Sequence, residues 1–211
     1  MSMMRLPNAP RHESRLAPAG MVAVLVLILV AVPRHYRLLP AYSEIVIGAG
    51  LIACLWTRFE RYAIAIFAVI VATVEVTIMV RLLYEMANVE SHLDPIMLLW
   101  TALDLWLTNV VLFTLIYWQL DRGGPDGRAG AWQGLADFSF PRGDPVEGLA
   151  ADWQPSFVDY LYLSFTTSTA FSPSEIYPLT DRGKILHIVQ SIVSLLIIIA
   201  LAARAIGILD K

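Results

Sequence analysis

A cluster of hydroxyl side chains in the C-terminal quarter of the chain is the stretch best suited to bind an ion. Its members are Ser164, Thr166, Thr167, Ser168, Thr169, Ser172 and Ser174, and the acidic Glu175 follows them. Hydroxyl and carbonyl oxygens can replace the water molecules around a cation in a narrow passage. We therefore expect the hydroxyls of Thr169, Ser172 and Ser174, together with backbone carbonyls, to line the entrance of a cation pathway.

The residues before this cluster predict a helix that is too short to cross a bilayer. Ser156 and Asp159 have the spacing of a capping box, which marks the start of a helix. A helix from Ser156 to about Thr167 is ~18 Å long, whereas the hydrocarbon of a bilayer is ~30 Å thick. The chain would then turn back inside the membrane, where irregular backbone must be buried in protein or face water.

The composition indicates the class of protein. Of the 211 residues, 57% are hydrophobic and 16% are charged, and the mean hydropathy is +0.63. These values predict an integral membrane protein. The apolar runs along the chain predict that it is all-α, with about five transmembrane helices, and the short helix described above adds one re-entrant helix and loop between the last two. The predicted spans are Met21–Val32, Ser43–Trp56, Tyr62–Tyr84, Pro95–Trp118 and Gly183–Ile208.

The stretch from Ser164 to Lys184 resembles the pore loop of the potassium-channel superfamily. The matching residues are Ser164, Phe165, Thr167 and Thr169 at the end of the pore helix, Glu175 at the acidic position, and Ile176, Tyr177, Pro178, Thr180, Gly183 and Lys184 at the exit. The resemblance implies a cation channel that assembles as a homotetramer in the cell membrane, the inner membrane in a bacterium. The loop is also similar to that of a group of bacterial membrane proteins with Phe-Ser-Pro here, which implies no activity.

The filter itself departs from the family pattern. Ala170, Phe171, Ser172, Pro173 and Ser174 stand where the family has Thr, Val, Gly, Tyr and Gly. Glycine permits backbone conformations that are costly for serine, and proline fixes φ and removes an N–H group. We therefore expect a non-canonical filter in which Phe171 and Pro173 form an apolar constriction, with weak selectivity or gating by dewetting.

The resemblance also suggests a division of the chain into parts. Residues 1–17 are expected to be a disordered basic tail, and residues 18–94 a three-helix membrane part. Residues 95–211 would form the pore module. Within it we expect an outer helix, a polar segment at 119–155, a pore helix at 156–168, a filter-like loop at 169–180 and an inner helix at 183–209.

The last helix carries one polar face. His187, Gln190, Ser191 and Ser194 recur at steps of three and four residues and therefore lie on the same side of an apolar helix. A water-lined pore wall explains this pattern. Contacts between helices explain it as well, because small and polar residues also collect at such contacts.

Three ionisable residues fall inside the third and fourth predicted spans. If residues 85–94 form the turn between the spans, Glu75 and Asp104 lie at similar depth and can face each other, with Arg81 nearby. One interpretation is a proton- or ion-sensing site beside the pore. The other is a charge-compensated structural triad.

The charge of the chain and its single cysteine exclude several kinds of site. A net charge of -3 argues against nucleic acid as a partner, because phosphate binding requires a basic surface. Cys54 alone forms no intrachain disulfide and no thiolate metal site. We expect no metal site and no cofactor other than a permeant cation. The expected partners are membrane lipid and copies of the chain itself.

Two further classes of function are weighed against a channel. One is a non-conducting pore-loop membrane protein that acts in assembly or partner binding, which the missing filter glycines favour. The other is an intramembrane enzyme with Ser172 as nucleophile and His187 as base. The sequence contains no Gly-x-Ser-x-Gly or His-Glu-x-x-His motif, so we do not expect an enzyme.

The positive charges predict an orientation. Basic residues on the side of the N-terminus and the pore loop outnumber those on the other side, and the positive-inside rule then places the N-terminus in the cytoplasm. The first set is Arg5, Arg11, Arg15, Arg58, Arg61, Arg122, Arg128, Arg142, Arg182 and Lys184, and the second is Arg34, Arg37, Arg81, Arg204 and Lys211. The resemblance to potassium channels implies the reverse orientation.

Overall fold

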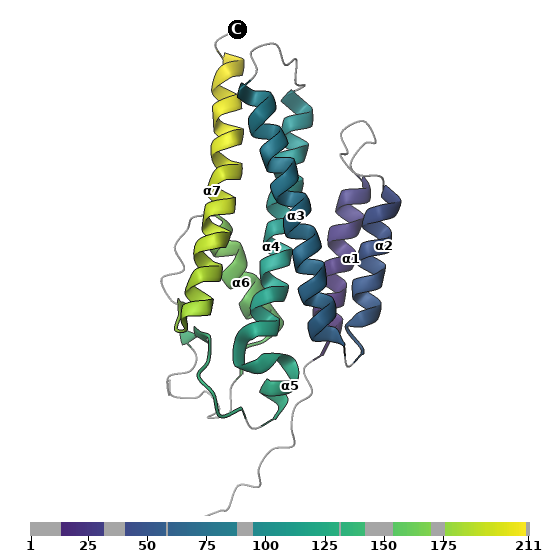
Figure 1. The fold of residues 1–211 in the computed structure, drawn as a ribbon, viewed down its shortest axis with the longest axis vertical. Coiled ribbons are helices and arrows are strands. Elements are labelled where there is room, and N and C mark those ends of the chain that lie inside the picture. Colours follow the sequence, from purple (N-terminus) through teal and green to yellow (C-terminus); the bar gives the residue numbers. More distant parts are fainter. Residues whose placement is uncertain are drawn as a thin grey trace, which may run out of the picture.

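The computed structural model of the chain is mostly helical. It describes residues 14–31, 41–57, 59–87, 95–130, 132–141, 154–169 and 176–209. Five apolar helices run along the long axis of the molecule (Figure 1). They are α1 (Leu16–Ala31), α2 (Ala41–Cys54), α3 (Glu60–Ala87), α4 (Pro95–Leu120) and α7 (Asp181–Leu209).

The arrangement of these helices gives the molecule two different ends. Helices α1, α3 and α7 begin at the lower end of Figure 1, which we call the loop end, and the chain finishes at the opposite end. A short helix, α6 (Phe157–Ser168), starts near the loop end and packs against both α4 and α7. Helices α1 and α2 pack against each other, and α1 also contacts α4.

Three helical segments are long and apolar enough to cross a membrane. They are Glu60–Val80, Leu99–Ala129 and Asp181–Ala200. Helices α1 and α2 are also apolar but contain 16 and 14 residues, fewer than the roughly 20 that a span usually requires. The prediction of a mostly helical, apolar chain is confirmed, and three of the helices are long and apolar enough to span a membrane. The count of five transmembrane spans and the re-entrant placement of the short helix stay predictions.

The surface of the helices is apolar, as the hydropathy predicts. Large hydrophobic side chains on α3 and α7 are exposed, including Val69 at 68%, Val80 at 60%, Ile185 at 61% and Ile188 at 57%. An exposed apolar area of this extent is unfavourable in water and is compatible with lipid or with other helices. The polar groups, by contrast, are concentrated inside the bundle and at the loop end.

The segment directly after α4 has a defined structure. It reverses direction through the turn η2 (Asp121–Gly123) into α5 (Gly124–Ala129), with positive φ at Arg122, Gly123 and Gly124. The two glycines adopt this backbone without the steric penalty that a side chain brings. The sequence predicted only a polar segment at 119–155. Residues 142–153 of it lie outside the described part.

A buried carboxylate holds the loop end together. Asp121 is fully buried and accepts hydrogen bonds from the Asp137 backbone N–H at 2.7 Å and from the Tyr160 hydroxyl at 2.7 Å. The buried Arg128 guanidinium donates to the carbonyls of Trp118 and Asp121 at 2.8 and 2.9 Å, and lies over the Tyr160 ring. These contacts attach the first turns of α6 to the end of α4.

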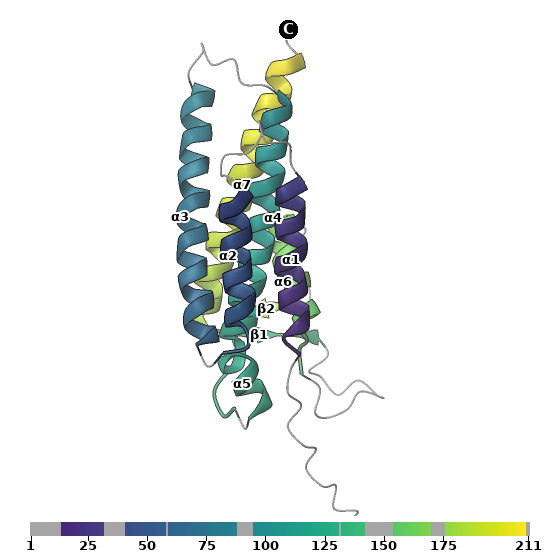
Figure 2. The ribbon, with the colours of Figure 1, turned by 90° about the vertical axis from the view of Figure 1, so that its right-hand side faces the viewer.

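A pair of short strands, one before α6 in the chain and one after it, lies at the same end. Strand β1 (Phe138–Ser139) pairs antiparallel with β2 (Tyr177–Pro178), just above α5 in Figure 2. Next to this pair, Asp137 accepts two hydrogen bonds from Arg182 at 2.6 and 2.7 Å, and its carbonyl accepts one from the Leu179 N–H at 2.8 Å. The segment before α6 and the segment after it therefore both lie at the loop end.

Two predicted boundaries need correction. The basic tail was expected to end at residue 17, but α1 begins at Leu16, where Ser14 accepts a hydrogen bond from the Leu16 N–H. Residues 1–13 lie outside the described part. The inner helix was expected from residue 183 and begins at Asp181, because the Thr180 hydroxyl accepts from the Gly183 N–H in its first turn.

The buried carboxylate predicts a large effect of one substitution on stability. Asp121→Ala leaves the Tyr160 hydroxyl and a backbone N–H buried without an acceptor, and should lower the free energy of unfolding by about 3 kcal/mol. Asp126→Ala is the matched control, because that side chain is 87% exposed and its ion pair with Arg15 should contribute little. Circular dichroism melts of the detergent-solubilised protein measure both. Equal melting temperatures for the two variants would contradict the role of Asp121.

Candidate functional site

The predicted pore helix forms with the expected start. The Asp159 carboxylate accepts hydrogen bonds from the Ser156 N–H at 2.8 Å and from the Ser156 hydroxyl at 2.7 Å, which completes a capping box. Helix α6 then runs for 12 residues and ends at Ser168. At this length it is ~18 Å long, well short of a bilayer hydrocarbon thickness of ~30 Å.

At the C-terminal end of α6, threonine hydroxyls donate hydrogen bonds to carbonyls of the same helix. The Thr167 side chain is buried and donates to the Leu163 carbonyl at 2.7 Å, and Thr169 donates to the Phe165 carbonyl at 3.1 Å. Thr167 therefore lies in the last turn of α6, and Thr169 directly follows this helix as the first residue of the expected filter-like loop. The rest of that prediction, Ala170, Phe171, Ser172, Pro173, Ser174 and Glu175, lies outside the described residues.

Gln190 of α7 connects three helices. Its side chain is fully buried, and its Nε2 donates to the hydroxyls of Ser164 and Ser168, each at 2.8 Å. Its Oε1 accepts from the Tyr117 hydroxyl of α4 at 2.6 Å. The Ser164 hydroxyl in turn donates to the Val110 carbonyl at 2.7 Å. One amide thus joins α4, α6 and α7 through groups that are all removed from water.

The four residues of the polar face of α7 differ in burial. Gln190 and Ser194 point into the bundle, and Ser194 accepts from the Asn109 amide at 2.8 Å. Both side chains bond to residues of α4, as the interpretation of this face as a helix contact predicts. Pore lining by this face stays a prediction. His187 and Ser191 are half-buried, and Ser191 donates to the His187 carbonyl one turn back.

Two aromatic residues of α4, which were not among the predicted site residues, bond to α6 and α7. The Trp106 indole N–H donates to the Ser168 carbonyl at 3.2 Å, and its ring packs edge-on against Phe165 at 5.6 Å. Tyr117 provides the hydroxyl that Gln190 accepts. A polar-tipped aromatic within an apolar span usually has a partner when buried, and that signal alone could have selected both residues.

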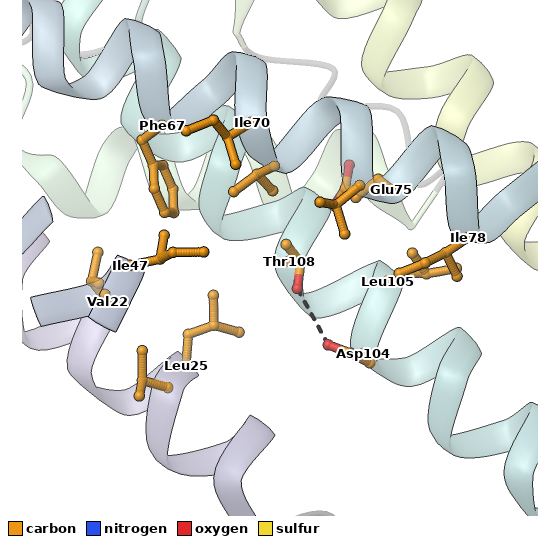
Figure 3. Close-up of a pocket in the computed structure, with 14 residues that line it drawn as sticks. Val22, Leu25, Ile47, Phe67, Ile70, Glu75, Ile78, Asp104, Leu105 and Thr108 are labelled. Atoms are coloured by element: carbon orange, nitrogen blue, oxygen red, sulfur yellow. Dashed lines mark hydrogen bonds between the residues drawn. The ribbon is translucent and has the colours of Figure 1, made fainter. Parts of the chain in front are cut away.

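The predicted intramembrane charges come together in part. Figure 3 shows a cavity bounded by α1, α2, α3 and α4. Glu75 and Asp104 both line it. The cavity measures about 110 Å³, and its other walls are mostly aliphatic. Asp104 accepts a hydrogen bond from the Thr108 hydroxyl at 3.4 Å, while Glu75 Oε1 has no hydrogen-bond partner among the described residues. The side chain of Arg81 lies outside the described part, so the proposed triad stays a prediction.

Comparison with other proteins adds nothing to this geometry. No protein-family model, no curated protein and no solved structure matches the chain. Among the described residues, no group of three or more His, Cys, Asp or Glu side chains is placed to hold a metal ion. The features of the chain that bear on its function are therefore α6, its hydrogen bonds to α4 and α7, and the return of the chain to the loop end.

The hydrogen bonds of Gln190 predict that this side chain stabilises α6, and a substitution tests this. Gln190→Leu keeps the size of the side chain but leaves the Tyr117 hydroxyl unpaired and removes the donors to Ser164 and Ser168. We expect amide hydrogen exchange in residues 160–168 to accelerate at least tenfold, which corresponds to about 1.4 kcal/mol of lost protection.

The matched control for this test is Ser191→Ala, one residue along α7. The Ser191 hydroxyl bonds only within its own helix in the structure, so exchange in α6 should stay within twofold of the unmodified protein. Hydrogen–deuterium exchange with mass spectrometry measures both variants. Unchanged protection of α6 in Gln190→Leu would show that the amide does not hold it.

Proposed function

We propose that this chain is a subunit of a potassium-channel-like pore-loop cation channel with a non-canonical filter. The observation that carries the proposal is the course of the chain around α6. A helix of 12 residues begins at the loop end, packs between two long apolar helices and is followed by a segment that returns to the same end. In a bilayer this course is that of a re-entrant helix and loop.

The hydrogen bonds around α6 support this placement. Irregular backbone is tolerated at membrane depth only where protein or water satisfies its polar groups. The Ser168 carbonyl, in the last turn of α6, accepts from Trp106, and the hydroxyls of Ser164 and Ser168 accept from Gln190. Each of these donors comes from a neighbouring helix, so α6 can end inside the bilayer without exposing these groups to lipid.

The electrostatics of α6 favour a cation over an anion. The C-terminal end of a helix carries a partial negative charge of roughly half an elementary charge. In α6 that end leads directly into residues 170–175, where Ser172, Ser174 and Glu175 add oxygen atoms. A passage that begins there would concentrate cations and would repel anions.

Assembly from several copies supplies the missing walls of the pathway. One α6 and one α7 cannot enclose a pore, and both helices leave large apolar side chains exposed, including Val158, Phe165, Ile192 and Leu195. We propose a homotetramer with these faces in contact with neighbouring copies or with lipid. Because Gln190 and Ser194 point inward within each copy, the wall contributed by α7 would be largely apolar, which suits gating by dewetting.

The orientation follows from the basic residues at the loop end. Arg15, Arg61, Arg122 and Arg182 belong to helix ends or turns there, and the positive-inside rule places such an end in the cytoplasm. We therefore propose a multi-pass protein of the cell membrane whose pore loop enters from the cytoplasmic side.

A second candidate is a non-conducting membrane protein that uses the same fold for assembly. The observation in its favour is that Gln190, Ser164 and Ser168 are fully engaged in holding helices together. Their hydroxyl and amide groups are then not available to an ion. This candidate shares the tetramer and the pore-loop geometry but predicts no current.

Planar bilayer recording separates the two candidates. Purified protein should carry a current whose reversal potential in a KCl gradient shows cation preference. Phe171→Ala should raise the single-channel conductance at least twofold, because it removes the bulkiest side chain of the expected constriction. Phe59→Ala, in the turn between α2 and α3, is the matched control and should leave conductance unchanged. An intact tetramer without current, in the unmodified protein and in Phe171→Ala, would favour the non-conducting alternative.

A further inference from the structure

A second, larger cavity lies on the other side of Glu75. It is a groove between α3, α4 and α7 with a volume of about 460 Å³, within the usual size range of ligand pockets. Its walls are apolar and include Val76, Met79, Leu112, Phe113 and Val193. Among the described residues that line it, Glu75 is the only charged one.

The Glu75 side chain, which lines both this groove and the smaller cavity, has an unsatisfied oxygen. The residue is only 7% exposed, and its Oε1 has no hydrogen-bond partner in the described structure. A buried carboxylate without a partner is costly, and the cost is relieved when a cation binds beside it. A neutral lipid tail would fill the volume but would leave this oxygen unpaired.

The chemistry of the walls selects the kind of cation. Small inorganic ions such as Ca²⁺ and Mg²⁺ require several oxygen ligands, whereas this groove offers one carboxylate in apolar surroundings. A cation with apolar substituents fits both features, since its substituents replace lipid against the walls while its charge pairs with Glu75. The Phe113 ring in the wall adds an aromatic surface that such cations favour.

We infer that the groove between α3, α4 and α7 binds a monovalent lipophilic organic cation, such as a quaternary ammonium or phosphonium compound, through Glu75. This inference goes beyond the proposed pore, because the described residues that line the groove come from α3, α4 and α7, and none of them belongs to α6. Absence of current would leave it standing, and absence of binding would leave the pore proposal standing.

Tetraphenylphosphonium is the probe that tests it. Equilibrium dialysis against the full chain in nanodiscs, with empty nanodiscs subtracted, should show saturable binding. Glu75→Gln removes the charge at constant size and should weaken binding at least tenfold. Glu75→Asp keeps the charge and should retain binding within about threefold. Tetraphenylborate has the same shape and the opposite charge, and it should bind at least tenfold more weakly than the phosphonium.

Two further variants locate the bound probe, and two measurements of folding identify misfolded variants. Ala72→Phe fills the groove without changing charge and should weaken binding, while Asp104→Asn alters the carboxylate that lines only the smaller cavity. Size-exclusion chromatography and circular dichroism identify variants that fold. The inference is overturned if folded Glu75→Gln binds as the unmodified protein does, if the borate binds equally, or if Asp104→Asn alone abolishes binding.

Discussion

The need to pair buried polar groups governs how this chain holds a short helix inside an apolar bundle. Helix α6 ends in hydroxyls and open carbonyls that neither lipid nor aliphatic side chains can satisfy. The amide of Gln190 and the indole of Trp106 supply partners from two neighbouring helices. Without them the last turn of α6 would bury polar groups alone, at a cost of about 1–3 kcal/mol for each group. The positions of α4 and α7 relative to each other follow from the same contacts.

Contacts at the loop end fix the start of α6 and the start of α7. Asp121 receives the Tyr160 hydroxyl at the start of α6, and Asp137 receives Arg182 at the start of α7. The Asp137 N–H itself donates to Asp121, so these two helix starts are tied to one another through a single short segment. Asp121 and Asp137, in a segment that looks like a mere connector, therefore hold the start of α6 and the start of α7 at the same end of the molecule.

Local signals explain what the sequence could predict. The capping box at Ser156 and Asp159, the length of α6 and the apolar helices depend on neighbours in the chain, and the structure contains each of them. The direction of Gln190 did not follow from sequence, because a polar stripe on an apolar helix fits a wet wall and a helix contact equally well. The bond between Tyr160 and Asp121 joins residues 39 positions apart, and an aspartate just after a helix resembles a solvated end. Only the tertiary arrangement distinguishes these alternatives.

Helix α7 is held unequally along its length. Arg182, Gln190 and Ser194 attach its first half through hydrogen bonds to three different elements. Beyond Ser194, the inward-facing residues up to position 200 are Ile197 and Ala200, which pack through apolar contact. Dispersion contacts tolerate sliding and small rotations, whereas directional bonds do not. Ser194 therefore marks a mechanical boundary within one continuous helix, and this hinge-like division arises from a change in the kind of contact, without a glycine or a proline.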